Sequence, residues 1–189
     1  MVDNSNFQKL DIKFDPKKLR QATNALFTKV SWRHHVVKGL CLTQIPGDPT
    51  SAYGEKLRGV FWTKPDFTGQ EVQREEFVDE SQYTEFVSKY KGTFFEEVYN
   101  VLSKKYRLGR VRLLLLEPRT SLSWHRDPEP RLHLPIITNQ GAHLVIDDSL
   151  MHLPADGHVW FTDTRNYHTV FNGGEENRIH LVATYLGKK

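Results

Sequence analysis

After Gly109 the spacing of apolar residues changes from a helical period to the alternation of β-strands, and this change constrains the fold most. Strands that are short and closely spaced are typical of a β-sandwich or barrel. We therefore expect an α+β fold that is mainly β, with a jelly-roll core over residues 109–187. Five segments of strand character support it: RVRLLLLE (110–117), RLHLPIIT (131–138), AHLVIDD (142–148), GHVWFTD (157–163) and RIHLVATYL (178–186).

The residues before this core suit helices that pack against it as a buttress. Asp15 can cap a helix of about four turns that begins at Pro16. The apolar residues of one face of that helix then follow at helical spacing: Leu19, Ala22, Leu26 and Val30. Between residues 79 and 105 the pattern predicts two more helices, with a break at Gly92 and with Thr93 as the second cap.

Strands and loops complete the N-terminal region. VVKGLCLTQI (36–45) and RGVFW (58–62) suit strands, because β-branched and aromatic residues dominate them. QIPGDPTSAYGEK (44–56) and TKPDFTGQ (63–70) contain Pro and Gly and are candidates for lid loops. We expect residues 1–108 to support the core within a single domain of residues 1–189.

Charge and cysteine content limit the partners of the chain. The net charge is +3 with lysine and arginine scattered along the chain, which gives no argument for nucleic-acid binding. Cys41 is the single cysteine, so no intramolecular disulfide can form, and we expect a reducing, cytoplasmic location. The N-terminus lacks the apolar stretch of a signal peptide, and the longest apolar run is LLLL at 113–116, so we expect no membrane contact.

Seven of the nine histidines lie between residues 125 and 180, so chemistry is expected in the C-terminal third. The stretch SLSWHRDPEPRLHLPI (121–136) separates His125 from Asp127, and Arg131 from His133, by two positions. In an extended chain, side chains two apart point to the same face. The stretch therefore directs an imidazole and a carboxylate, and then a cation and an imidazole, toward whatever that face covers.

A second imidazole for a metal can come from another strand, and His168 in RNYHTVFNGG is the candidate. Two histidines and one carboxylate on one face of an octahedral ion leave three positions open, as in non-heme Fe(II) oxygenases. A co-substrate that chelates the ion and carries a distant carboxylate needs a buried cation. Arg178 lies ten residues after His168 and stands in RIHL (178–181), which repeats the RLHL motif of 131–134.

Two other functions stay open on these residues alone. Two histidines and a carboxylate also suit a zinc-dependent hydrolase, although hydrolysis needs no buried arginine at the position of Arg178. A cupin-like binding module could keep the barrel without turnover, although all three ligand residues are present. HRD (125–127) does not belong to a protein kinase, because Leu132 stands where the catalytic loop of a kinase needs Asn.

One ordered set of residues resembles the Fe(II)/2-oxoglutarate-dependent oxygenases, specifically their aspartyl/asparaginyl β-hydroxylase-like branch: His125-x-Asp127, Arg131-x-His133, His168 and Arg178-x-His180. The resemblance covers about residues 108–187 and implies a double-stranded β-helix, the cupin-like form of the jelly roll. It also implies a ligand set for the metal and a group of side chains for 2-oxoglutarate. These are His125, Asp127 and His168 for the metal, and Arg178 with His133 or Arg131 for 2-oxoglutarate.

The same resemblance implies the reaction. Such an enzyme uses Fe(II), 2-oxoglutarate and O2, hydroxylates an unactivated C–H bond of an amino acid or of a peptide or protein side chain, and releases succinate and CO2. Because it has Asp127, the chain is more similar to the members with a full triad of ligands. The mammalian members of the branch lack the carboxylate ligand. RVRLLLLE (110–117) lacks the hydroxyl residue that some members carry on the first core strand.

Arginines near these motifs favour a substrate that bears a carboxylate, such as an amino acid or a peptide. Arg126 and Arg165 are the candidates for substrate contact, and His180 can reach the pocket too. Three further histidines fit no role in the pattern, and we expect them at the surface or at strand edges: His143, His152 and His158.

Overall fold

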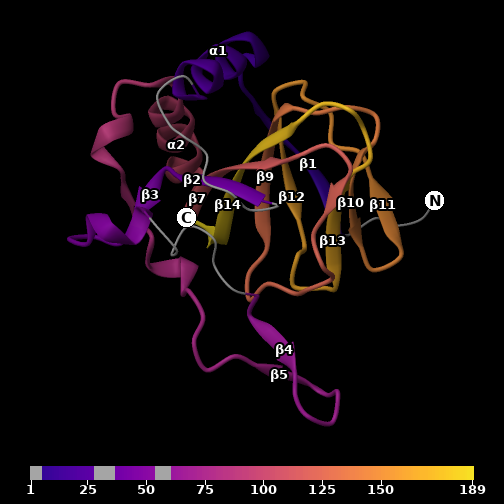
Figure 1. The fold of residues 1–189 in the computed structure, drawn as a ribbon. Coiled ribbons are helices and arrows are strands. Elements are labelled where there is room, and N and C mark those ends of the chain that lie inside the picture. Colours follow the sequence, from indigo (N-terminus) through magenta and orange to yellow (C-terminus); the bar gives the residue numbers. More distant parts are fainter. Residues whose placement is uncertain (1–5, 28–36, 54–60) are drawn as a thin grey trace.

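Two antiparallel β-sheets pack face to face in the computed structural model, which describes residues 6–27, 37–53 and 61–189 (Figure 1). The strand order is β1-β12-β9-β14-β7-β2 in the larger sheet and β11-β10-β13-β8 in the smaller one. The mainly β jelly roll expected from the strand pattern is therefore confirmed. The strands of the larger sheet are β1 Phe7–Lys13, β2 Val37–Cys41, β7 Tyr106–Leu116, β9 Arg131–Ile137, β12 His158–Thr162 and β14 Arg178–Lys188. Those of the smaller sheet are β8 Thr120–Ser121, β10 Ala142–Ile146, β11 Ser149–Met151 and β13 His168–Asn172.

Alternation along β9 and β14 explains the repeated R-x-H motif. Leu132 and Leu134 of β9 belong to the hydrophobic core that faces the helices, whereas Arg131 and His133 point to the opposite face, inside the jelly roll. In the antiparallel pairing of the two strands, His133 lies opposite Val182 of β14. Arg178 and His180 share that inner face with Val182, because the three follow one another at two-residue spacing along β14. The barrel interior is therefore lined by charged and imidazole side chains.

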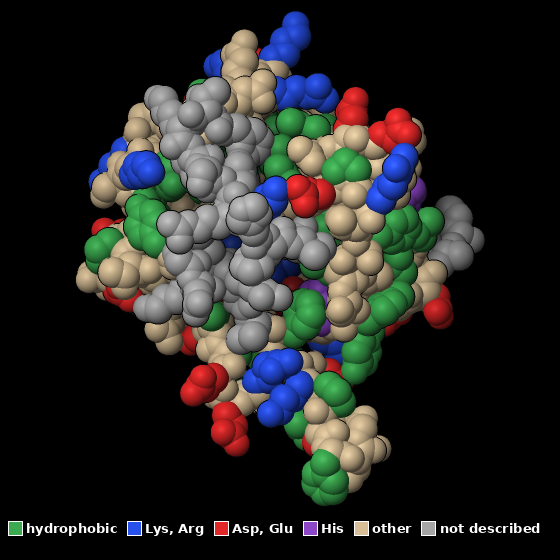
Figure 2. Space-filling model, in the orientation of Figure 1, with side chains coloured by type: hydrophobic (Ala, Val, Ile, Leu, Met, Phe, Trp, Pro, Cys, Tyr) green, Lys and Arg blue, Asp and Glu red, His purple; other side chains and the backbone are tan. Residues whose placement is uncertain are grey.

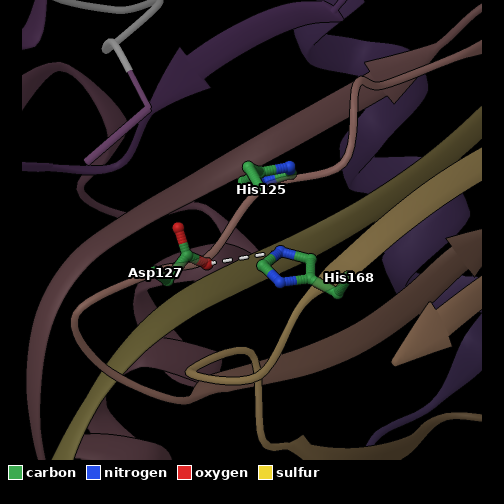
Figure 3. A group of neighbouring side chains, drawn as sticks. All are labelled: His125, Asp127 and His168. Carbon is green, nitrogen blue, oxygen red and sulfur yellow. Dashed lines mark ion pairs between the residues drawn. The ribbon is translucent and has the colours of Figure 1, made fainter. Parts of the chain in front are cut away.

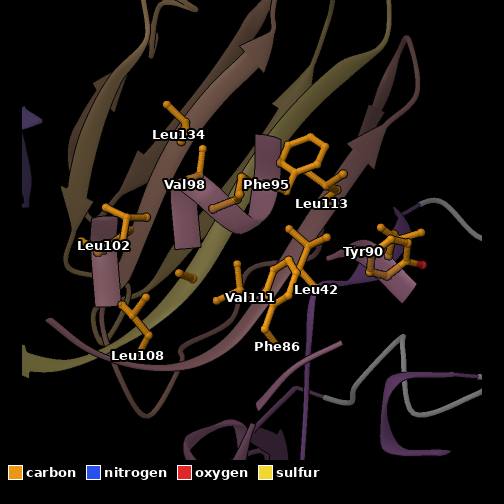
Figure 4. Packing of buried hydrophobic residues seen from close by; sticks show 14 of the residues in the cluster. Leu42, Phe86, Tyr90, Phe95, Val98, Leu102, Leu108, Val111, Leu113 and Leu134 are labelled. Atoms are coloured by element: carbon orange, nitrogen blue, oxygen red, sulfur yellow. The ribbon is translucent and has the colours of Figure 1, made fainter. Parts of the chain in front are cut away.

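Both helices of the described residues pack on the outer face of the larger sheet. Figure 4 shows Phe95, Val98 and Leu102 of the second helix near Leu113 and Leu134 of that sheet. The first, α1 Pro16–Phe27, begins as expected, with the amide of Lys17 donating to Oδ1 of Asp15 at 2.8 Å. Val30, expected on its apolar face, lies outside the described residues. The side chains that bury the two helices against the sheet include Leu19, Leu26, Phe95, Val98 and Leu102.

The second helix, α2 Phe94–Lys105, follows Thr93 as expected, but Thr93 does not cap it with its side chain. The Thr93 hydroxyl donates to the carbonyl of Tyr90 at 2.6 Å. The Gly92 amide instead donates to a carboxylate oxygen of Glu96 at 2.7 Å, which ties the start of the helix to the preceding turn.

The helix expected before Gly92 was a wrong prediction. That segment contains two 3₁₀ turns, η3 Glu80–Gln82 and η4 Ser88–Tyr90, with the short strand β6 Glu85–Phe86 between them. The strand forms because Phe86 pairs with Thr43 in β3 Thr43–Gln44, and the Val87 amide donates to the carbonyl of Leu42 at 2.9 Å. Pairing with a distant segment overrides the local helical spacing.

The N-terminal region also adds strands to the jelly roll. β1, which the sequence did not predict, pairs with β12, and β2 pairs with β7 at the opposite edge of the larger sheet. Residues 63–70 do not form a simple loop, since they make most of a hairpin of β4 Thr63–Pro65 and β5 Glu71–Gln73. This hairpin projects away from the sheets (Figure 1). The other lid candidate holds η1 Pro49–Ala52 and runs beyond the described residues, as does most of RGVFW.

Two hydrophobic cores result from this layering. One lies between the helices and the larger sheet, and the other fills one part of the space between the sheets. The second core contains Phe7 and Leu116 of the larger sheet with Leu144, Ile146 and Val170 of the smaller sheet. In the described part of the chain, no helix has the length and apolar character needed to cross a membrane.

Candidate functional site

Backbone pairing brings the first two expected ligand residues together. His125 and His168 form an isolated antiparallel bridge, with hydrogen bonds of 3.0 Å and 2.9 Å between their amides and carbonyls. Their rings lie 4.1 Å apart between centroids. His168 begins β13, whereas His125 lies in the irregular segment before β9. The expectation of an extended chain at 121–136 therefore holds locally at His125, where the bridge forms.

Asp127 completes a group of three that could hold a metal ion. The Asp127 amide donates to the carbonyl of Thr164 at 2.9 Å, which fixes the segment that carries the carboxylate. One atom each from His125, Asp127 and His168 lie within 4.8 Å of one another. Figure 3 shows the three side chains converging, with Asp127 Oδ2 at 3.6 Å from His168 Nε2.

Hydrogen bonds orient both imidazoles for metal binding. Nδ1 of His125 lies 2.7 Å from the carbonyl of Ser123, and Nδ1 of His168 lies 3.0 Å from that of Asn166. A carbonyl can only accept, so each Nδ1 carries the proton and each Nε2 keeps its lone pair. Phe61 stacks on His125 with ring centroids 4.2 Å apart and so fixes the ring plane as well.

The charge states of the three groups also suit a metal. Burial, followed by the neighbouring His168, lowers the pKa of His125 to about 4, and burial also lowers the pKa of His168. Burial alone would raise the pKa of Asp127, but the Arg131 guanidinium, together with the neighbouring His168 and His125, holds that pKa below its usual value. At neutral pH the group therefore presents two neutral imidazoles and one carboxylate, the state that metal binding needs.

Arg131 lies beside the candidate metal ligands, and its guanidinium has partners there. Its Nε donates to Oδ2 of Asp127 at 3.1 Å, its Nη1 donates to the hydroxyl of Thr184 at 2.6 Å, and its Nη2 lies 3.0 Å from Glu80. These contacts engage all three nitrogens of the guanidinium, and one of the partners is the candidate metal ligand Asp127. Its expected contact with 2-oxoglutarate stays a prediction.

Glu80, whose side chain is 11% exposed, belongs to this region and was not predicted from the sequence. Burial would raise its pKa, but Arg112, Arg131 and Arg110 together lower it to about 2. A signal was present in the sequence, since Arg110 and Arg112 alternate on an otherwise apolar strand. Two largely buried cations on one strand face need an anion.

A second polar group lies between the sheets and contains Arg178, His180 and His133. Arg178 Nη2 lies 2.9 Å from Nδ1 of His180, and that nitrogen lies 3.4 Å from Nδ1 of His133. A guanidinium can only donate, so Nδ1 of His180 accepts and Nε2 of His180 carries the proton. Nε2 of His180 is buried and has no hydrogen-bond partner among the described residues. The group therefore contains a buried N–H donor, Nε2 of His180, that has no acceptor among the described residues.

Arg178 is the cation of this group, and it is 4% exposed. Burial lowers its pKa to about 9, and no described carboxylate forms an ion pair with it. Burial also lowers the pKa values of His133 and His180 well below the usual value. A buried guanidinium beside neutral imidazoles is a fitting receptor for a carboxylate, which would supply the missing charge and acceptor.

Aromatic and charged side chains border the candidate metal ligands on the side of the β4–β5 hairpin. Arg126 points away from Asp127, with its guanidinium 5.8 Å from the ring of Trp62 and 5.6 Å from that of Tyr167. It also lies 3.8 Å from a carboxylate oxygen of Glu71 in β5. Figure 2 shows a histidine side chain at the surface near the centre of the face, beside hydrophobic side chains. A hollow next to Asp127 is lined by Trp62, Phe77, Val78, Pro128 and Glu129.

Arg165 and the three histidines without an assigned role lie apart from these groups. Arg165 pairs with Asp163 through two hydrogen bonds of 2.7 Å, so its guanidinium is occupied. His180, expected at the substrate, lies with Arg178. Three histidines without an assigned role occupy other places: His143 stacks on Phe171, His152 contacts the carbonyl of Ala142, and His158 lies 3.0 Å from Asp156.

Solved structures share the fold of the chain. The viral collagen prolyl hydroxylase of Paramecium Bursaria Chlorella virus-1, solved with 2OG, is 12% identical with a TM-score of 0.54, over 98% of this chain and 97% of that one. A 2OG-Fe(II) oxygenase family oxidoreductase from Burkholderia pseudomallei is 14% identical with a TM-score of 0.53, over 97% and 85% of the two chains. At these identities the likeness concerns the fold. No curated protein matches the chain in sequence.

A family model carries the comparison further. The model described as Aspartyl/Asparaginyl beta-hydroxylase matches residues 50–186, which is most of the chain and includes every residue of the two polar groups. The match agrees with the resemblance drawn from the ordered histidine, aspartate and arginine motifs. The protein therefore belongs to the aspartyl/asparaginyl β-hydroxylase family, and it is an enzyme of the 2-oxoglutarate-dependent hydroxylase class.

Proposed function

We propose that the protein is an Fe(II)- and 2-oxoglutarate-dependent dioxygenase that hydroxylates an unactivated C–H bond of a carboxylate-bearing amino acid or peptide, and releases succinate and CO2. One observation carries the proposal. The interior holds two complementary groups: His125, Asp127 and His168 converge at one place, and Arg178 lies with His180 at the other. The first group suits a metal, and the second suits the far carboxylate of a dicarboxylic acid.

The donor set fits iron. Two neutral imidazole nitrogens and one carboxylate on one side of an ion leave open positions, as in other 2-His-1-carboxylate sites. Iron with 2-oxoglutarate and dioxygen supplies the oxidising chemistry that a C–H bond requires. The side chains of this protein contribute binding and orientation. His125 and His168 stay neutral at physiological pH, and Asp127 stays ionised because Arg131 neutralises part of its charge.

Arg178 and His180 orient the co-substrate in this proposal. The guanidinium of Arg178 and the Nε2 proton of His180 both need an acceptor in a buried site. A carboxylate satisfies both needs at once, which gives affinity and fixes the direction of the keto acid end. A zinc hydrolase has no need of this pair, and family membership favours the hydroxylase over a binding module.

Arg126 is our candidate for recognition of the substrate. It is next in sequence to His125, it borders the hairpin, and its guanidinium has a carboxylate only at 3.8 Å. Arg165, the other arginine expected at the substrate, has no substrate contact in this proposal, because Asp163 already occupies its guanidinium. The substrate of the proposal is therefore a carboxylate-bearing amino acid or peptide segment. A cytoplasmic location stays a prediction from the single cysteine.

Succinate formation in the presence of Fe(II), 2-oxoglutarate and O2 tests this assignment with a panel of free amino acids and short peptides. For a substrate found in this way, Arg126→Ala should raise KM about tenfold or more, because a charged hydrogen bond to the substrate is lost. Arg165→Ala is the matched control and should leave KM within about twofold. An unchanged KM in Arg126→Ala would contradict the substrate assignment, and absence of O2-dependent succinate with every candidate would count against the reaction.

A further inference from the structure

Glu80 brings its carboxylate from η3 into the polar interior, where four donors surround it. Oε1 lies 2.7 Å from Nη2 of Arg112 and 3.3 Å from Nη1 of Arg110. Oε2 lies 3.0 Å from Nη2 of Arg131 and accepts a hydrogen bond of 2.8 Å from the hydroxyl of Thr184. One carboxylate thus balances three cations, which are Arg110 and Arg112 of β7 and Arg131 of β9.

The backbone holds Glu80 firmly in this position. Asp79 caps η3, since its Oδ1 accepts from the amide of Ser81 at 3.0 Å. Gly109 of β7 lies directly against the backbone of Glu80, and a Cβ at Gly109 would collide with the Glu80 carbonyl. The absence of a side chain at Gly109 therefore allows η3 to rest on the sheet and deliver the Glu80 carboxylate.

Arg131 connects Glu80 to the candidate metal ligand Asp127. Its guanidinium is planar and rigid, so contacts on one edge determine where the other nitrogens point. Thr184 closes the arrangement, because its hydroxyl accepts from Arg131 at 2.6 Å and donates to Glu80. With Nη1 and Nη2 fixed in this way, Nε of Arg131 meets Oδ2 of Asp127 at 3.1 Å.

We propose that Glu80 is a positioning residue of the metal site, which holds Arg131 so that Asp127 stays directed at His125 and His168. The proposal rests on the metal site proposed above. Glu80 also shares the charge of Arg131. Without Glu80, the nearest carboxylates to Arg131 are Asp127 at 3.1 Å and Glu129 at 3.7 Å. Arg131 would then neutralise Asp127 more fully and compete with a metal ion for its oxygens.

The test measures metal affinity rather than turnover. Mn(II) is a redox-stable probe for a site of nitrogen and oxygen ligands, and its dissociation constant is read from the free-ion signal in electron paramagnetic resonance. Glu80→Gln keeps the shape of the side chain and removes its charge. We expect it to weaken Mn(II) binding about tenfold or more, as loss of a residue that orients a metal ligand does. Glu80→Asp should recover part of this loss.

Two controls separate positioning from a general structural effect. Glu85→Gln removes a carboxylate from the same segment, where Glu85 contacts Gln44 at 2.9 Å, and should leave Mn(II) affinity within about twofold. In an Arg131→Met background, Glu80→Gln should have little further effect, because Glu80 acts through Arg131. Thr184→Val, which removes the bridging hydroxyl but keeps the volume, should weaken binding in the same direction if Glu80→Gln proves too unstable to titrate.

The outcomes distinguish this inference from the metal site itself. If folded Glu80→Gln binds Mn(II) as wild type does, or if its effect is equally large in the Arg131→Met background, Glu80 does not position the site and the inference is wrong. If wild type binds Mn(II) no better than His168→Ala does, the metal site is wrong, and the inference falls with it. A tenfold loss that disappears in the Arg131→Met background supports both.

Discussion

Arg178 is a buried cation without a carboxylate partner among the described residues. In our proposal it binds 2-oxoglutarate, but it destabilises the protein when the co-substrate is absent. Methionine fills a similar volume without charge. We expect Arg178→Met to raise the free energy of unfolding of the metal-free protein by about 1–3 kcal/mol, because an uncompensated buried charge is costly. The same change should weaken 2-oxoglutarate binding at least about tenfold, since a charged hydrogen bond is lost.

Urea denaturation and anaerobic 2-oxoglutarate titration measure the two effects. Arg165→Met is the matched control, because Arg165 is exposed and paired with Asp163, and it should change stability by no more than about 0.5 kcal/mol. An Arg178→Met protein that is less stable than wild type and still binds 2-oxoglutarate normally would contradict this account of Arg178.

At the scale of single residues, the sequence predicts groups that follow a spacing and misses those that depend on distant contacts. The spacing of His125 and Asp127 predicted two ligands on one face, the family resemblance added His168, and the structure brings the three together. The alternation of RLHL and RIHL placed the arginines and histidines on one face. The partners of Arg131 could not be predicted, because Glu80 reaches it from a 3₁₀ turn in a region where helical spacing was misleading.

At the scale of elements, Gly109 joins η3 to β7. We expect Gly109→Ala to destabilise the protein by about 1–3 kcal/mol, since the new methyl group would collide with the Glu80 carbonyl in a packed interior. The same displacement should weaken Mn(II) binding, because Glu80 moves with η3. Chemical denaturation measures the first effect and Mn(II) titration the second.

Gly173→Ala is the control for this prediction, because the nearest atom to a Cβ there is the Gly141 carbonyl oxygen at an ordinary 3.5 Å. Gly173→Ala should lower the free energy of unfolding much less than Gly109→Ala does. Equal stability of the two variants would show that the close approach of η3 to β7 is not needed.

Elements with a local sequence pattern were predicted well, and elements that depend on pairing with distant segments were not. Strands β9, β10, β12 and β14 appear where alternation placed them, because side chains of different character alternate between the two faces, even in β9 and β14, where both faces are buried. β7 begins at Tyr106 and not after Gly109, since its first residues pair with the end of β14. β6 and β1 were missed for a similar reason: each is extended because a partner far away in the sequence supplies its hydrogen bonds.

At the scale of the whole molecule, the polar interior makes stability depend on pH. His125, His133, His168 and His180 all have lowered pKa values in the folded protein, mainly because of burial, and that of His125 is about 4. In the unfolded chain each has a pKa near 6.5. As the pH falls below about 6.5, the unfolded chain takes up protons that the folded protein does not. The free energy of unfolding therefore falls, by about 1.4 kcal/mol per pH unit for each such histidine, until the folded pKa is reached.

Urea denaturation of the metal-free protein between pH 7.5 and pH 5 tests this dependence. We expect stability to be highest at the upper end of this range and to fall steeply toward pH 5. His133→Phe should make the fall shallower, whereas His158→Phe, which removes a histidine outside the polar interior, should not. A stability that stays constant from pH 7.5 to pH 5 would show that these histidines are not held neutral.

The central claim concerns the whole interior, because it requires the metal group and the Arg178 group to act on one co-substrate. Anaerobic titration of the protein with Fe(II) and 2-oxoglutarate tests it most directly, through the visible charge-transfer band of the chelate. We predict a band in wild type, no band in His168→Ala, and a band that needs at least about tenfold more 2-oxoglutarate in Arg178→Ala. No band in wild type, together with tight zinc binding that 2-oxoglutarate does not affect, would contradict the account.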